Sequence, residues 1–333
     1  MAVQLSTSAG GVIADATDSF DMMDKLIDFI TGVTAGETGK ELPVGERWVV
    51  NKDDSVTIAG ERHVYLQGPG LSGTDAIYVV VRIYSDAPNN LHNWEIKGAT
   101  GFSDGLAYDE QPGGSTVYSY LTLSNANMPF WFVVSGRRII LVAQTAGSVT
   151  YAAYLGWYLP YATPSEFPYP MFCGGSTCSS TYNYLQTNYQ VGNFYDGPNG
   201  ASVAKRLTDA AAHVRHRDGS WLTCSAYYQT SGASRPSSYA SQCFVWPHDE
   251  VNASQYEYKM VQSVGDEFAV FPFILYSTDN GGNIYGELDG IFFSPLGTVG
   301  KKFPDTITIA TKVYLVINNT YRTSEANAAL LLE

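Results

Sequence analysis

The hydrophobic pattern of the chain contains one stretch with helical period, near the N-terminus. Over residues 17–31, large apolar side chains recur three and four positions apart, at Phe20, Met23, Ile27 and Ile30. Asp18 stands where an N-cap is expected and Gly32 follows the end, so both boundaries carry the usual signals. This pattern predicts an amphipathic helix. Its apolar stripe could pack on the chain's own sheet or bind a partner.

The most apolar part of the sequence is residues 128–171. It holds two runs of aromatic and aliphatic residues, 130–134 and 139–143, with the turn residues Ser135 and Gly136 between them. A third run, 149–159, follows another small-residue turn. We expect three consecutive antiparallel strands, and the first two are apolar at nearly every position. That pattern predicts strands buried on both faces.

Short strand-like runs separated by turn residues fill much of the remaining chain. They are spaced roughly 10–15 residues apart and do not alternate with helical segments, which argues against a doubly wound α/β fold. The sequence therefore predicts a mainly β protein, with antiparallel β-sandwich or barrel-like domains and one N-terminal amphipathic helix. The expected strands are 48–52, 55–58, 61–66, 75–84, 93–98, 117–123, 217–228, 256–261, 268–276, 284–293, 306–309 and 312–319, with a short helix at 202–212.

Two domains are expected from a length of 333 residues. Prolines crowd the segment after the apolar strands, and proline cannot donate to a sheet ladder. Beyond that segment the composition shifts to Ser, Thr, Asn, Tyr and Gly. We place an N-terminal β domain at 1–165, which includes the helix 17–31, and a C-terminal β-rich domain with cysteine-containing loops at 166–333. The prolines are Pro160, Pro164, Pro168 and Pro170.

Charge is scarce and mostly negative. Charged residues make up 15% of the chain, while Gly (32) and Tyr (24) are abundant. A tyrosine-rich surface of low charge suits a subunit covered by neighbours in an assembly, although an ordinary β-sandwich poor in lysine would look the same. The net charge of −13 opposes binding to nucleic acid. No signal peptide and no transmembrane segment is expected, so we predict synthesis in a cytoplasm without membrane insertion.

Four cysteines, Cys173, Cys178, Cys224 and Cys243, all follow residue 170. Four residues separate the first two and eighteen separate the last two, which is not the spacing of a zinc site. Disulfides are an alternative, with three connectivities available. Cys173 with Cys178, and Cys224 with Cys243, would each close a loop. A reducing cytoplasm opposes early oxidation, so four free thiols remain the other reading.

Other candidate chemistry in the sequence is weak. His213 and His216 have the spacing of two metal ligands on a helix, but no acidic or sulfur ligand accompanies them. The segment 279–283 lacks the glycine and glutamate of a calcium loop, so a turn is the better reading. No nucleophile elbow, phosphate loop or dinucleotide fingerprint occurs. We predict no enzymatic activity, no cofactor and no metal site.

Several phrases of the sequence together resemble uncharacterised virion structural proteins of tailed bacteriophages. The resemblance runs over most of the chain, and it rests on short segments of similar sequence and not on a catalytic motif. It implies a particle component of the tail, baseplate or collar, and it assigns no functional residue. The phrases are DSFDMMDKLIDFI (18–30), LQGPGLSGTD (66–75), PFWFVVSGRRII (129–140), AYLGWYLPYATPSEFPYP (153–170) and YGELDG (285–290).

The expected function is therefore a structural virion protein that binds copies of itself and neighbouring virion proteins. Residues 1–16, mostly small and polar, would be an arm or a loosely held strand, and the apolar tail 328–332 could also reach a neighbour. The alternative is a module that binds host-surface glycan through Tyr and Trp in its polar loops at 172–200 and 230–242.

Overall fold

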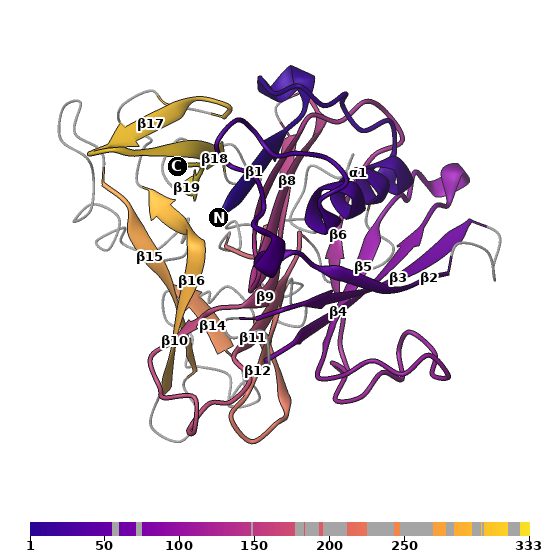
Figure 1. Cartoon of the computed structure of the whole chain (residues 1–333), viewed down its shortest axis with the longest axis vertical. Coiled ribbons are helices and arrows are strands. Elements are labelled where there is room, and N and C mark those ends of the chain that lie inside the picture. Colours follow the sequence, from indigo (N-terminus) through magenta and orange to yellow (C-terminus); the bar gives the residue numbers. More distant parts are fainter. Residues whose placement is uncertain are drawn as a thin grey trace, which may run out of the picture.

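The computed structural model is mainly β, with one α-helix among its described residues and antiparallel sheets that form a sandwich-like or barrel-like fold (Figure 1), which confirms the predicted fold class. The structure describes residues 1–54, 60–70, 75–147, 149–176, 183, 193–195, 212–224, 243–246, 269–277, 283–294, 301, 303–318 and 327–333. The expected strands 55–58 and 256–261 and most of the expected helix 202–212 lie outside these residues. Within the described part, no helix is long and apolar enough to cross a membrane.

The predicted helix is present as α1 (Ser19–Thr31). The Asp18 carboxylate accepts hydrogen bonds from the backbone N–H groups of Phe20 and Asp21, both over 2.8 Å. Gly32 ends the helix with a φ of 81°, a left-handed conformation that glycine adopts without strain. The apolar stripe is buried in the chain's own core, which confirms the intramolecular alternative; its buried residues include Met22, Met23, Leu26, Phe29 and Ile30.

A five-stranded antiparallel sheet follows the helix, in the order β2-β3-β4-β5-β6. One face of it is apolar and packs toward α1 and the central strands. The opposite face carries charged and tyrosine side chains, as the period-two alternation of antiparallel strands allows. The strands are β2 (Val49–Asp54), β3 (Glu61–Gly68), β4 (Ile77–Tyr84), β5 (Trp94–Ala99) and β6 (Ser119–Leu121).

The second sheet has fourteen strands within the described residues, in the order β1-β7-β8-β9-β11-β12-β13-β14-β15-β16-β19-β18-β17, with β10 beside β16. All but one of its described strand pairs are antiparallel. Its strands are β1 (Ala2–Leu5), β7 (Phe130–Ser135), β8 (Arg138–Ala146), β9 (Val149–Trp157), β10 (Leu159–Pro160), β11 (Met171–Gly174), β12 (Ala212–Arg215), β13 (Trp221–Cys224), β14 (Cys243–Trp246), β15 (Phe271–Ser277), β16 (Asn283–Ser294), β17 (Thr306–Ile309), β18 (Lys312–Asn318) and β19 (Asn327–Leu331).

The central strands β7, β8 and β9 are shared by two hydrophobic cores. Alternate residues, such as Phe132 and Leu141, face α1 and the five-stranded sheet, and the ring centroids of Phe29 and Phe132 are 6.3 Å apart. The residues between them, such as Val133 and Ile140, face the C-terminal strands. Figure 1 shows these strands between the five-stranded sheet and strands β15–β19. Both faces are buried, as the continuous apolar runs predicted.

Both chain ends are built into the large sheet. Of the two alternatives expected for residues 1–16, the strand is found and the arm is not, and the expectation of a tail that reaches a neighbour is wrong. β1 pairs with β7 from Ala2↔Val134 to Leu5↔Trp131, and Ala2 is buried. β19 lies between β16 and β18. Lys40 also forms an ion pair with the C-terminal Glu333. Most apolar side chains at the two ends are buried in the protein's own core, whereas Met1 is 38% exposed; the buried ones include Ala2, Val3, Ala328, Ala329, Leu330 and Leu332.

The proline-rich segment separates β10 from β11, but it does not end the sheet. Met171 of β11 pairs with Trp157 of β9, so the chain returns to the strand it left. Pro160 itself lies in β10, opposite Gly286. The expected boundary at 165/166 falls within this connection, and strands from both sides of it belong to one sheet. The division into domains 1–165 and 166–333 stays a prediction. Short 3-10 turns occur at Thr7–Ala9, Val44–Glu46 and Ala87–Asn89.

Candidate functional site

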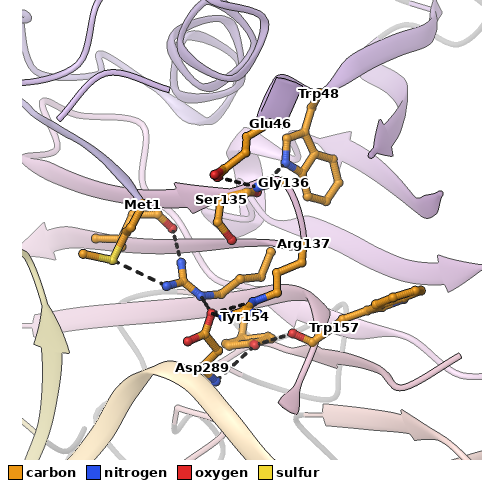
Figure 2. Close-up of polar contacts among 11 residues, drawn as sticks. Met1, Glu46, Trp48, Ser135, Gly136, Arg137, Tyr154, Trp157 and Asp289 are labelled. Atoms are coloured by element: carbon orange, nitrogen blue, oxygen red, sulfur yellow. Dashed lines mark hydrogen bonds and ion pairs between the residues drawn. The ribbon is translucent and has the colours of Figure 1, made fainter. Parts of the chain in front are cut away.

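Two arginines and one aspartate join the β7–β8 hairpin to the C-terminal strands (Figure 2). Arg137 lies in the hairpin turn and Arg138 begins β8, because Ser135 pairs with Arg138 across the turn. The Oδ2 atom of Asp289, in β16, accepts from Nε of both arginines over 2.9 Å. Gly290, with a φ of 81°, follows the aspartate, and a Cβ there would collide with Nη2 of Arg138. We call these three charged residues the arginine junction.

Burial makes the arginine junction electrostatically strong. The Arg138 side chain is 2% exposed and that of Asp289 is 17% exposed. Burial acts to raise the pKa of Asp289, but the charges of Arg138 and Arg137 outweigh it and hold that pKa below its usual value. The remaining donors of Arg138 are also used, since Nη1 donates to the carbonyl of Val133 over 3.1 Å. The carboxylate thus stays ionised between its two partners.

Tyr154 supports the arginine junction from below. Its hydroxyl donates to the carbonyl of Trp157 over 2.6 Å and accepts from the backbone N–H of Asp289 over 3.3 Å. The phenol is fully buried, and burial raises the pKa of Tyr154. The hydroxyl therefore remains protonated and acts as a fixed spacer between β9 and β16.

The same hairpin turn is anchored to the five-stranded sheet on its other side. Glu46 accepts from the backbone N–H of Gly136 over 3.1 Å, and Nε1 of the buried Trp48 donates to the carbonyl of Ser135 over 2.9 Å. Gly70 donates its N–H to the carbonyl of Gly136 over 2.9 Å. The turn is thus a point at which both halves of the chain meet.

A cavity of about 570 Å³ opens beside the arginine junction. Its described lining carries two arginines against Asp289 and Glu46, so the charges of these residues balance. This arrangement could hold a polar group or remain filled with solvent. The lining residues are Met1, Gly45, Glu46, Gly70, Ser135, Gly136, Arg137, Arg138, Asp289 and Leu331.

A second charged cluster lies on the outer face of the five-stranded sheet. Arg82 binds Glu61 through two hydrogen bonds of 2.9 and 2.6 Å, and it donates to Glu95 over 3.0 Å. Tyr108 donates its hydroxyl to the other oxygen of Glu95 over 3.0 Å. The arginine lowers the pKa of Glu61, whereas burial raises the pKa of Glu95. Such a difference between carboxylates can mark an acid–base pair. Here Arg82 lies between them, so the arrangement fits a structural ion cluster better.

A smaller cavity of about 300 Å³ lies near β10 and the start of β16. Phe167 and Tyr285 give it aromatic walls, with ring centroids 6.0 Å apart. Tyr161 lies beside it with 57% of the residue exposed, and its backbone N–H donates to the carbonyl of Tyr285 over 2.9 Å. The cavity is lined by Ala162, Glu166, Phe167, His216, Arg217, Asn283, Ile284 and Tyr285. Aromatic walls with a few polar groups are typical of small-ligand pockets.

The structure describes three of the four cysteines, and all three are buried: Cys173, Cys224 and Cys243. Burial raises the pKa of the Cys173 thiol to about 12. Cys178 lies outside the described residues. Cys224 and Cys243 face each other on neighbouring strands. Cys173 belongs to the core on the opposite face of the sheet, so the pairings that join it to either of them are incompatible with the sheet.

The idea of a helical histidine pair is wrong, because His213 lies in β12 and His216 directly follows it. Residues three apart on a strand point to opposite faces. His213 bonds the Ser119 hydroxyl over 2.8 Å, while His216 contacts Asp218 over 2.9 Å. Among the described residues, no group of three or more metal-ligating side chains occurs. Residues 279–282 of the rejected calcium loop lie outside them.

Sequence reasoning missed the arginine junction. Its signal was two charged residues at the turn of an otherwise apolar hairpin, and a third charge, Asp289, before a glycine in a largely apolar strand. A charge inside an apolar run implies a buried partner, but sequence alone does not identify that partner 151 residues away.

No family model matches this chain, and no curated protein matches it.

Proposed function

We propose that this chain is a structural component of a bacteriophage virion that assembles through protein–protein interfaces in the tail, baseplate or collar region. The resemblance of several sequence segments to virion structural proteins supports a role in the virion. Exposed apolar side chains support assembly through protein–protein interfaces. The arginine junction and the ion cluster around Arg82 also fit a structural protein, because their charges are paired within the molecule and link strands to one another. A stiff subunit loses little conformational freedom when it assembles.

The observation that carries the proposal is a set of three exposed valines around the C-terminal end of α1. Val33, Val44 and Val49 are 74%, 77% and 53% exposed. We call them the valine shoulder. The segment that bears them is firmly held, because the backbone N–H of Trp48 donates to the carbonyl of Ile30 over 2.9 Å and the Trp48 side chain is buried.

Burial of the valine shoulder against a partner would contribute about 1.5 kcal/mol for each side chain. That is enough for the apolar centre of an interface but not for a whole one, which needs ~1,200–2,000 Å² of buried surface. The low density of charge on this chain suits the rest of such a contact. The expected partners are other copies of the chain and neighbouring virion proteins.

The test is the solution mass of the recombinant chain, measured by light scattering after size exclusion. We expect a discrete oligomer for the wild type and a 36.3 kDa monomer for the triple variant V33D/V44D/V49D. The matched control is Val12→Asp. Val12 is 76% exposed but lies toward the Phe130 end of β7, whereas Trp48 binds at the Ser135 end. A wild-type chain that neither oligomerises nor cosediments with particles would contradict the proposal.

A second candidate function is binding of a host-surface glycan, and the smaller cavity favours it. Exposed Tyr161 lies beside aromatic walls, with Glu166, Arg217 and Asn283 in the lining to accept or donate hydrogen bonds to hydroxyl groups. Titration of the chain with host polysaccharide fragments, followed by calorimetry, tests it. Tyr161→Ala should abolish binding. Tyr161→Phe keeps the ring and removes only the hydroxyl, which donates to Glu287 over 3.0 Å, so it should retain most of the affinity.

A further inference from the structure

The two halves of the large sheet meet at a short seam between β13 and β14. Among the strand pairs of the described residues, this is the one parallel pair, and its register consists of the single pair Cys224↔Cys243. The neighbouring antiparallel pairs are longer, with four residue pairs each between β12 and β13 and between β14 and β15. Within the described residues, the seam is therefore the shortest of these three contacts, and both of its residues are cysteines.

The two thiols lie close enough to interact. Directly paired residues on neighbouring strands have Cα atoms about 4.8 Å apart, which falls within the range of about 4.4–6.8 Å found for disulfides. The Cys224 thiol also shares a side-chain hydrogen bond with Cys243. Both residues belong to the core between the central and C-terminal strands. Burial, and next the contact with Cys243, raise the pKa of the Cys224 thiol.

The sheet register excludes the other partner for this pair. Cys173 pairs with His213, whereas Cys224 pairs with Ala212, the residue before that histidine. Successive residues of a strand point to opposite faces, so the Cys173 side chain lies on the opposite face of the sheet from Cys224. Cys173 accordingly belongs to the core that faces α1. Of the three connectivities for four cysteines, the two that join Cys173 to Cys224 or Cys243 would require a side chain to pass through the sheet.

We propose that Cys224 and Cys243 form an oxidisable pair that closes into a disulfide across the seam when the protein meets an oxidising low-molecular-weight disulfide such as oxidised glutathione. One cysteine thiolate attacks the small disulfide and releases one small thiol. The second thiolate then attacks the mixed disulfide and releases the other. The protein loses two protons and two electrons, and the reagent is reduced to two thiols. The new bond replaces a single residue pair with a covalent staple.

The environment of the pair predicts when it reacts. Only the thiolate attacks, and the raised pKa of the buried Cys224 thiol leaves little thiolate there, so Cys224 reacts slowly in the folded protein. A reducing cytoplasm also keeps the pair reduced. Once oxidised, it closes a loop that contains the eighteen residues between the two cysteines. A loop of that length is expected to lower the unfolding equilibrium constant by roughly 100-fold, because it restrains the unfolded chain. The proposal stands on the sheet register and does not depend on a virion role.

Refolding of the full chain from denaturant in a glutathione redox buffer tests the proposal, because access to the buried thiols is then not limiting. Digestion with chymotrypsin without reduction can cleave after Tyr228 and Tyr239, so a disulfide is seen as a linked pair of peptides containing Cys224 and Cys243. We expect this linkage in most molecules, and it should persist in Cys173→Ala. Cys224→Ser should lose it.

Stability supplies the second readout. The oxidised wild type should unfold at a higher denaturant concentration than Cys224→Ser, and reductant should remove the difference. Three results would overturn the proposal: both thiols stay free after refolding, the linked peptides contain Cys173 or Cys178 instead, or the linked protein is no more stable than the serine variant.

Discussion

Arg138 and Asp289 are bound Nε to Oδ2 over 2.9 Å, although 151 residues separate them in the sequence. Arg138 begins the central strand β8 and Asp289 lies in β16, so the pair fastens the C-terminal strands to the middle of the sheet. Because the arginine side chain is almost fully buried, the energetic value of the pair depends on both members being present.

Removal of the carboxylate alone should be costly. Asp289→Asn leaves two guanidinium groups at one site without their counter-charge, and we expect a loss of about 3 kcal/mol in the free energy of unfolding. Arg137→Gln should cost much less, because Arg138 still neutralises Asp289 and the Arg137 side chain is 26% exposed. Urea unfolding at pH 7 measures both. Equal losses for the two variants would contradict this account.

Replacement of both buried charges should behave differently from removal of one. The double variant R138M/D289L removes both members of the buried pair and leaves only Arg137, which is 26% exposed, without its partner, so it should recover much of the stability lost in Asp289→Asn. A double-mutant cycle with the single variants measures the coupling energy. Additive losses would mean that the two side chains act independently.

His213 should make the protein sensitive to mild acid. Burial, with a smaller contribution from Lys97, lowers the pKa of His213 from 6.5 to about 3. Below pH 6.5 His213 binds a proton in the unfolded chain but stays neutral in the folded protein. The free energy of unfolding therefore falls as the pH falls toward 3. The slope for one such group is about 1.4 kcal/mol per pH unit.

Urea unfolding between pH 7 and pH 5 measures this slope, since most carboxylates stay ionised there. His213→Gln removes the titrating group and keeps a polar partner for the Ser119 hydroxyl, so the slope should become shallower. The slope that remains is expected to include His92, because burial lowers the pKa of that histidine too. A wild-type protein whose stability is constant over this range would exclude a neutral buried His213.

The local structure of this chain followed from its sequence where local signals agreed. Asp18, the helical apolar period and Gly32 together predicted α1, and the continuous apolar runs at 130–134 and 139–143 predicted strands buried on both faces. Each of these signals acts between near neighbours. A strand covered on both faces needs apolar residues on both, and this requirement does not depend on which elements cover it.

Long-range pairing could not be read in the same way. Residues 1–16 lack a strong strand signal, yet Ala2 to Leu5 are held because β7 offers an edge and residues 37–40 cover the other side. The spacing of His213 and His216 does not by itself distinguish a helix from a strand. The pairing of β12 with β11 and β13 places His213 in a strand. The Arg138–Asp289 and Cys224–Cys243 contacts depend on which strands become neighbours, which local sequence does not specify.

The cap of α1 offers a small and well-defined test of local stability. Asp18→Ala removes the acceptor for the backbone N–H groups of Phe20 and Asp21 and should cost about 1 kcal/mol. Asp28→Ala is the matched control in the last turn of the same helix, where a negative charge opposes the helix dipole, so its removal should be neutral or slightly stabilising. Thermal unfolding of both variants measures the difference, and a larger loss for Asp28→Ala would contradict it.

Deletion of residues 1–6 should damage the folded chain itself rather than only its assembly. Val3 donates its N–H to the carbonyl of Lys40 over 2.9 Å and accepts from the N–H of Glu37 over 2.7 Å, so β1 joins β7 to the following loop. Its loss would bare the edge of β7, an apolar strand, and such edges promote aggregation. We expect a lower thermal midpoint and faster amide exchange in β7, with Val12→Ser as an unaffected control. An unchanged midpoint with altered oligomer mass would instead restore the idea of an assembly arm.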